Sequence, residues 1–230
     1  MPDRPDINSG IFRKHWETGF DFGLEKLRNQ LLPVIQHLEN EGKLGKVIAD
    51  VGSGKVGVSS LIDFPDKKIV RVDLVADVAM NDNQAQMMAD LRTIDNPPIG
   101  TKKQLAYIRN WLRNEGLQEG DKPAVDTMIL SRVLNYIDYK QVLSQLAHYL
   151  KSNSRLIVFN KIDLGYWDAF SEKRPKNNME VIEFLKQIGF ESEIIQYDGV
   201  DRYASKFHFS GPEQITKGEL LYVGRKLSDK

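Results

Sequence analysis

A carboxylate followed by closely spaced glycines, directly after an apolar run, constrains the fold of this chain more than any other segment. Residues 46–49 (KVIA) predict a short buried strand, residues 50–57 read DVGSGKVG, and residues 58–62 (VSSLI) can begin a helix. Glycine allows a tight turn with positive φ and lets a ligand approach the backbone with no Cβ in the way. A strand, a glycine turn and a helix in this order are typical of a site for a nucleotide-like ligand.

Two classes of cofactor fit this turn. Gly52, Gly54 and Gly57 match the dinucleotide pattern Gly-x-Gly-x-x-Gly, in which a pyrophosphate sits at the N-terminus of the helix. Asp50 favours another ligand, because a carboxylate repels a pyrophosphate, whereas the sulfonium and the amino group of S-adenosylmethionine are cationic. An ordinary turn with a surface aspartate is the remaining alternative. Asp50 therefore favours S-adenosylmethionine over a dinucleotide at this turn.

Composition limits the other classes of function. A chain of 230 residues has room for one α/β domain with a sizeable core. Its 32 basic and 32 acidic residues balance, so we expect neither nucleic acid nor a membrane surface as a partner. No apolar stretch approaches the length of a membrane span, and the first residues lack the order of a secretion signal, so we expect a cytoplasmic protein. The absence of cysteine excludes disulfides, thiolate metal sites and cysteine nucleophiles, and no metal site is expected.

Apolar runs alternate with helical patterns, which predicts a mostly parallel sheet with helices on both faces. Five runs alternate with helical segments, and two late runs with no helical pattern between them predict an antiparallel pair at one edge. The predicted strands are residues 47–51, 68–74, 86–91, 125–130, 154–159, 193–197 and 219–225. Helical spacing predicts helices that include residues 27–38, 105–112, 142–150 and 181–188, and the third of them should begin at Asp138 or just after it. Pro33 should kink or restart the first of these helices, and Gly189 should cap the last.

This order of elements resembles the whole class I (Rossmann-like) family of S-adenosylmethionine-dependent methyltransferases, over about residues 24–226. Asp50-x-Gly52-x-Gly54 is similar to the first motif of that family, although the third glycine is shifted to Gly57, which keeps the dinucleotide alternative open. The resemblance implies one α/β domain, residues 23–230, with a seven-stranded sheet. It also implies that residues 1–22 form an N-terminal segment that can fold over the site as a lid.

The resemblance also implies which residues bind the cofactor. An acidic residue at the end of the second strand accepts hydrogen bonds from both ribose hydroxyls, and another, after the third strand, takes the adenine amino group between apolar walls. The chain after the fourth strand faces the cofactor and the substrate. The implied cofactor-binding residues are Asp50, Gly52, Ser53, Gly54, Asp73, Leu74, Asp90, Leu91, Ser131 and Arg132.

The activity that this resemblance implies is transfer of a methyl group from S-adenosylmethionine to an oxygen or nitrogen of a small molecule by in-line displacement. Alignment of the two reactants can supply much of the catalysis, and the sequence identifies no general base. Weaker candidates for binding the methyl acceptor lie in three insertions: His15, Trp16, Asp163, Tyr166, Trp167, Tyr203 and His208. The sequence does not identify the methyl acceptor, which could be a protein, or the oligomeric state. A nicotinamide-dependent (NAD or NADP) oxidoreductase and a non-catalytic binding protein with the same fold are the alternatives.

Overall fold

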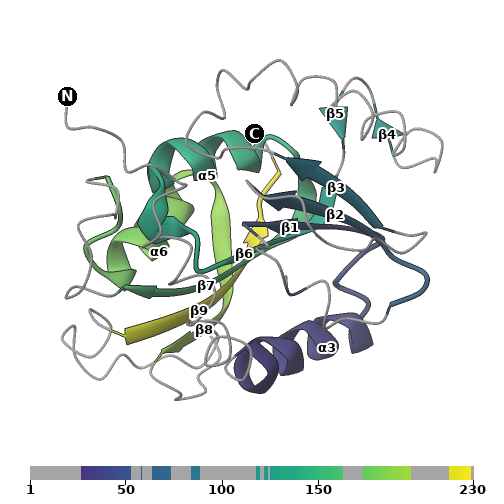
Figure 1. The fold of residues 1–230 in the computed structure, drawn as a ribbon, viewed down its shortest axis with the longest axis horizontal. Helices are drawn as coiled ribbons and strands as arrows, with labels where there is room; N and C mark the ends of the chain where they lie inside the picture. Colours follow the sequence, from purple (N-terminus) through teal and green to yellow (C-terminus); the bar gives the residue numbers. More distant parts are fainter. Residues whose placement is uncertain are drawn as a thin grey trace, which may run out of the picture.

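The computed structural model describes residues 27–52, 58, 64–73, 84–88, 118–119, 122–123, 125–162, 173–197 and 218–228. Figure 1 shows a twisted sheet with α5 and α6 on one face and α3 on the other. The helical elements are η1 (Leu27–Leu31), α3 (Leu32–Asn40), η4 (Leu134–Tyr136), α5 (Tyr139–Ala147) and α6 (Asn178–Gln187). The strands are β1 (Val47–Val51), β2 (Lys68–Asp73), β3 (Gln84–Met88), β4 (Gln118–Glu119), β5 (Lys122–Pro123), β6 (Val125–Ser131), β7 (Leu150–Ile162), β8 (Phe190–Tyr197) and β9 (Gly218–Lys226).

The main sheet has seven strands in the order β3-β2-β1-β6-β7-β9-β8. The first five strands are parallel, and β9 runs antiparallel to both β7 and β8. This topology confirms the predicted parallel sheet closed by an antiparallel pair. The short hairpin of β4 and β5 was not predicted.

Both faces of the sheet are buried, which explains the continuous apolar runs in the sequence. Side chains alternate along β1, so Val47, Ala49 and Val51 join the core beneath α5 and α6. Ile48, between them, joins the second core beneath α3. The strands were therefore recognisable, but the runs did not reveal which residue faces which helix.

Local capping accounts for the ends of the helices. The Asp138 carboxylate accepts a hydrogen bond from the Gln141 amide at 3.3 Å and begins α5. Asn177 does the same for α6 through the Glu180 amide at 2.9 Å. Gly189 follows α6 with φ +91°, which confirms its predicted place as a helix cap.

The N-terminal helical segment shows what the proline does there. A single π-helical turn, η1, precedes α3, and Pro33 lies in the first turn of α3, where its missing N–H interrupts no helical hydrogen bond. Pro33 therefore lies where the π-helical turn passes into α3.

The predicted helix over residues 142–150 was too long at its C-terminal end. α5 stops at Ala147, and Leu150 is already the first residue of β7. The cause is a long-range contact, because the buried ammonium of Lys226 donates hydrogen bonds to the carbonyls of Ala147 and Leu150, at 2.9 and 3.0 Å. A cation from β9 thus stabilises the end of the helix and the turn into the strand.

The predicted helix over residues 105–112, the helix after the glycine turn and the segment 1–22 lie outside the described residues. In the part of the chain that the structure describes, no helix is long and apolar enough to cross a membrane.

Candidate functional site

The carboxyl ends of β1, β2, β6 and β7 lie side by side at the same end of the sheet. We call this row of strand ends, which is distinct from the outer strands of the sheet, the carboxyl edge. The register places Val51 beside Val72 and Leu130, and Ser131 beside Phe159. Parallel α/β sheets bind ligands outside this edge, close to the strand where the order of connection reverses. In this sheet the reversal occurs between β1 and β6.

Gly52 begins the turn after β1 and lies directly against the turn after β6. Its φ is +72°, and its amide donates a hydrogen bond to the carbonyl of Val72 at 2.7 Å. A Cβ at this position would lie 2.8 Å from Cβ and Cγ2 of Val133. Only glycine therefore satisfies both the backbone conformation and the close approach of the two turns.

Asp50 lies inside the sheet rather than at an exposed mouth. Its side chain is 0% exposed and, by alternation along β1, points to the α3 face. The register sets it beside Arg71 of β2, which is also buried, and beside Ile129 of β6. The register therefore places two buried opposite charges at neighbouring positions of β1 and β2. Contact between Asp50 and a cofactor stays a prediction.

Arg71 is a residue that the sequence analysis missed. In the sequence, Arg71 is a single basic residue within the otherwise apolar run of residues 69–72. A buried position for that cation could not be inferred without its neighbour across the sheet.

Arg132 directly follows β6 in an uncommon backbone conformation. Its φ is +57°, in the left-handed region that costs a non-glycine residue about 1–2 kcal/mol. Its amide donates to the Phe159 carbonyl at 2.7 Å, and its guanidinium carbon lies 5.7 Å from the centre of the Phe159 ring. Ser131, the last residue of β6, is opposite Phe159. The two residues predicted after the fourth strand thus lie at the carboxyl edge.

Asn135 and Asn160 were also missed. They come from η4 and β7, they are buried, and Asn160 Nδ2 donates a hydrogen bond to Asn135 Oδ1 at 3.4 Å. Each resembles an ordinary loop or strand residue in the sequence, and only the fold places the two amides together.

The other predicted site residues are not tested by the structure. Asp73 ends β2 opposite Met88, but its side chain is not described. The remaining candidates lie outside the described residues: Ser53, Gly54, Leu74, Asp90, Leu91, His15, Trp16, Asp163, Tyr166, Trp167, Tyr203 and His208. Among the residues that are described, no group of three or more His, Asp or Glu side chains could hold a metal ion.

Asp126 organises the opposite edge of the sheet. Its carboxylate accepts hydrogen bonds from the amides of Lys46 and Val47, at 2.9 and 3.0 Å, and from Lys151 Nζ at 2.9 Å. Burial raises the pKa of Asp126, but the Lys151 ammonium and the two amides lower it further, so the pKa lies below the ordinary value. This carboxylate ties the start of β1 to β6 and β7.

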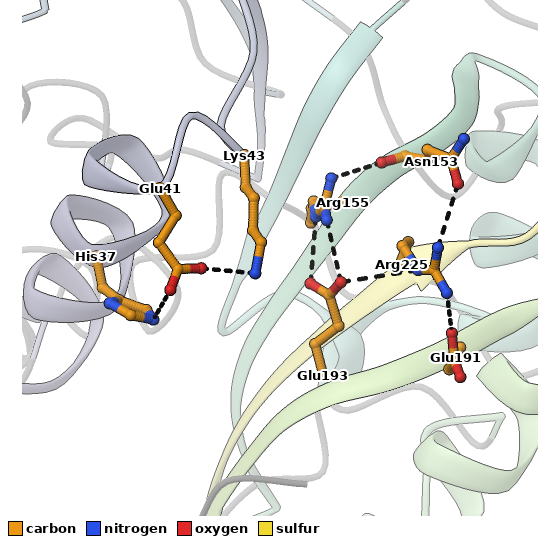
Figure 2. Close-up of polar contacts among 8 residues, drawn as sticks. All are labelled: His37, Glu41, Lys43, Asn153, Arg155, Glu191, Glu193 and Arg225. Carbon is orange, nitrogen blue, oxygen red and sulfur yellow. Dashed lines mark hydrogen bonds and ion pairs between the residues drawn. The ribbon is translucent and has the colours of Figure 1, made fainter. Parts of the chain in front are cut away.

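A cluster of charged side chains also lies away from the carboxyl edge (Figure 2). Glu193 accepts from Arg155 Nε and Nη2, at 3.2 and 3.0 Å, and Arg225 pairs with Glu191 and Glu193. Arg155 precedes Phe159 by four strand residues, which corresponds to about 13 Å along β7. Acidic and basic groups alternate in this cluster, so it joins β7, β8 and β9 without creating a field of one sign.

The strand order, with the glycine turn at the point of reversal, defines the class I methyltransferase fold. No protein-family model matches the sequence, and no curated protein matches it. Similar solved structures include a 1,6-didemethyltoxoflavin-N1-methyltransferase from Burkholderia thailandensis, with TM-score 0.57 and 15% identity over 95% of this chain and 87% of that one. Magnesium protoporphyrin IX methyltransferase from Synechocystis has TM-score 0.56 and 16% identity over 97% and 94% of the two chains.

A Haloferax volcanii protein in complex with the Trm112 methyltransferase activator is similar over 94% of this chain and 98% of that one, with TM-score 0.56 and 14% identity. Identities at this level establish a shared fold.

Proposed function

We propose that this chain is a cytoplasmic S-adenosylmethionine-dependent methyltransferase that acts on an oxygen or nitrogen of a small molecule. The observation that carries the proposal is the turn at Gly52, which is pressed against Val133 at the carboxyl edge of a class I methyltransferase fold. Two solved structures with this fold support it, because one holds S-adenosylhomocysteine with 1,6-didemethyltoxoflavin and the other holds S-adenosylmethionine.

The residues at this edge fit such a cofactor. A side chain at Gly52 would strike Val133, so glycine at this position lets the turn after β1 pack directly against the turn after β6. Asp73, at the end of β2, would accept hydrogen bonds from the two ribose hydroxyls. When bound, S-adenosylmethionine supplies an electrophilic methyl group that an oxygen or nitrogen nucleophile can displace from sulfur.

The chain contributes mainly by holding the two reactants in line. The backbone of Gly52 and Arg132 is fixed by hydrogen bonds to the carbonyls of Val72 and Phe159, so both turns are anchored to the sheet. Such positioning of reactants can lower the barrier by about 7–11 kcal/mol in well-oriented systems.

Calorimetric titration of the purified protein with S-adenosylhomocysteine, NAD and NADP tests the proposal. We expect micromolar binding of S-adenosylhomocysteine alone, and loss of this binding in Asp73→Ala. Asp66→Ala is the matched control, because Asp66 is an exposed aspartate just before the same strand, at its other end. Binding of a nicotinamide cofactor alone would indicate an oxidoreductase, and binding of none of the three would favour a non-catalytic protein.

A further inference from the structure

We propose that Asn160, held in place by Asn135, binds the methyl acceptor through a hydrogen bond, and that this acceptor is an uncharged molecule with an N–H or O–H donor. The assignment rests on the proposed function and names the class of its second substrate. It concerns two buried amides that are not among the predicted cofactor-binding residues.

The position of Asn160 suits the methyl acceptor better than the methyl donor. Phe159 is the last residue of β7 paired with β6, opposite Ser131, so Asn160 lies one residue beyond the end of β6. β6 separates β7 from β1, the strand that leads into the glycine turn, which places Asn160 two strand spacings, or about 10 Å, to the side of that strand.

The surroundings of Asn160 are apolar. Along β7, Val158 joins the core beneath α5 and α6, and Asn160 shares that face by alternation. Its partner across β9 is the buried Leu220. A leucine at position 160 would fit such a place, so the polar side chain requires a reason.

The amide of Asn160 is only half satisfied. Asn160 is 1% exposed, and its Nδ2 donates to Asn135 Oδ1 at 3.4 Å. Its Oδ1 accepts no hydrogen bond from the part of the chain that the structure describes. Most buried polar groups in proteins have a hydrogen-bond partner, so this oxygen calls for an explanation, and a donor that arrives with a ligand supplies one. The hydrogen bond from Asn160 to Asn135 fixes the amide and directs this oxygen.

The chemistry of this oxygen selects the ligand. A carbonyl oxygen attracts N–H and O–H groups and repels a carboxylate, which only accepts hydrogen bonds when ionised. The guanidinium of Arg132 lies against Phe159, whose side chain belongs to the opposite face of the sheet. A heterocyclic N–H or a hydroxyl therefore suits Asn160, and an acid does not.

The test replaces Asn160 by leucine, which has a similar size and no polar atom. We expect Asn160→Leu to change the melting temperature of the free protein little, because the lost hydrogen bond to Asn135 Oδ1 is offset by removal of an unsatisfied buried oxygen. Thr127→Val is the control, because Thr127 is a buried polar residue of β6 whose hydroxyl donates to the Leu44 carbonyl at 2.6 Å, a completed hydrogen bond that the protein alone uses. This control should lower the melting temperature.

Binding is then measured by ligand-observed NMR on protein saturated with S-adenosylhomocysteine, with benzimidazole, catechol and benzoate as probes. Benzimidazole or catechol should bind to the wild type, and Asn160→Leu should weaken that binding about 5- to 100-fold. Benzoate should not bind, and the affinity for S-adenosylhomocysteine should change less than twofold in both variants. Thr127→Val should leave probe binding unchanged.

Three results would overturn the assignment of Asn160 alone while S-adenosylhomocysteine still binds. The first is a fall in the melting temperature of Asn160→Leu as large as that of Thr127→Val, which would indicate a structural amide. The second is equal binding of the uncharged probes to wild type and variant, as expected if a buried water molecule satisfies Asn160. The third is a wild type that binds neither benzimidazole nor catechol. Failure of the wild type to bind S-adenosylhomocysteine would overturn the proposed function itself, and this assignment with it.

Discussion

Replacing Gly52 by alanine should destabilise the protein far more than the same replacement at Gly42. Both glycines have a similar backbone conformation, with φ +72° and +67°. A Cβ at Gly42 would meet nothing within 4 Å, whereas a Cβ at Gly52 would lie 2.8 Å from two atoms of Val133. The pair therefore separates the cost of the conformation from the cost of the close approach.

The magnitudes follow from these two contributions. A left-handed backbone costs alanine about 1–2 kcal/mol, and the stiffer unfolded chain returns about 0.4–1 kcal/mol. The net loss for Gly42→Ala is therefore about 1 kcal/mol. An added carbon in a packed contact costs about 1–3 kcal/mol more, so the loss for Gly52→Ala is about 2–4 kcal/mol.

Equilibrium unfolding in urea measures both losses, and Val133→Ala shows whether the contact is the cause. In a double-mutant cycle, Val133→Ala should recover part of the extra loss in Gly52→Ala, because it removes Cγ2, one of the two colliding atoms, while the Cβ of residue 133 stays. Gly52→Ala should also weaken binding of S-adenosylhomocysteine, while Gly42→Ala should not. Equal destabilisation at the two glycines, or additive effects of Gly52→Ala and Val133→Ala, would refute the packing of the two turns described above.

Three further predictions concern buried polar groups. The lowered pKa of Asp126 means that its stabilising effect is complete above the ordinary pKa of 3.8 and is lost as the pH falls through the lower folded-state value. Urea unfolding should therefore show Asp126→Asn to be less stable than the wild type at pH 7, and the difference in stability should disappear in acid. A difference that stays constant with pH would show that Asp126 does not stabilise the protein as an anion. Burial raises the pKa of Tyr222 to about 12. The difference in absorbance at 295 nm between the wild type and Tyr222→Phe should therefore titrate near that value, and a midpoint near 10 would contradict the burial of Tyr222. Arg71→Met should lower the free energy of unfolding, because it leaves the buried carboxylate of Asp50 without the cation at the neighbouring register position. Adding Asp50→Asn should restore much of that loss, whereas additive losses would show that the two charges do not interact.

The strands were predictable because both faces of the sheet are covered. β1 and β6 are therefore mostly apolar along their length, which local sequence reveals. The start of α5 was predictable for a similar reason, since Asp138 caps it from the adjacent position. The end of α5 was not, because it depends on Lys226, which is 79 residues from Ala147 in the sequence.

The residues of the candidate site also fall into two groups: those that local sequence reveals and those that depend on strand pairing. The sequence predicted Gly52 and Arg132 at the carboxyl edge because a turn at the end of a strand is a local feature. The interior position of Asp50 and the presence of Arg71 beside it depend on strand register, which local patterns do not contain. Asn135 and Asn160 lie 25 residues apart and meet only when β7 pairs with β6.

Amide hydrogen–deuterium exchange of the wild-type protein, with and without S-adenosylhomocysteine, tests most directly whether the carboxyl edge binds the methyl donor. We expect the ligand to slow exchange in peptides that cover residues 50–52 and 131–135, and to leave residues 153–157 and 190–194 of the charged cluster unchanged. Protection confined to the charged cluster, or no protection of the turns at Gly52 and Arg132, would contradict the proposed site.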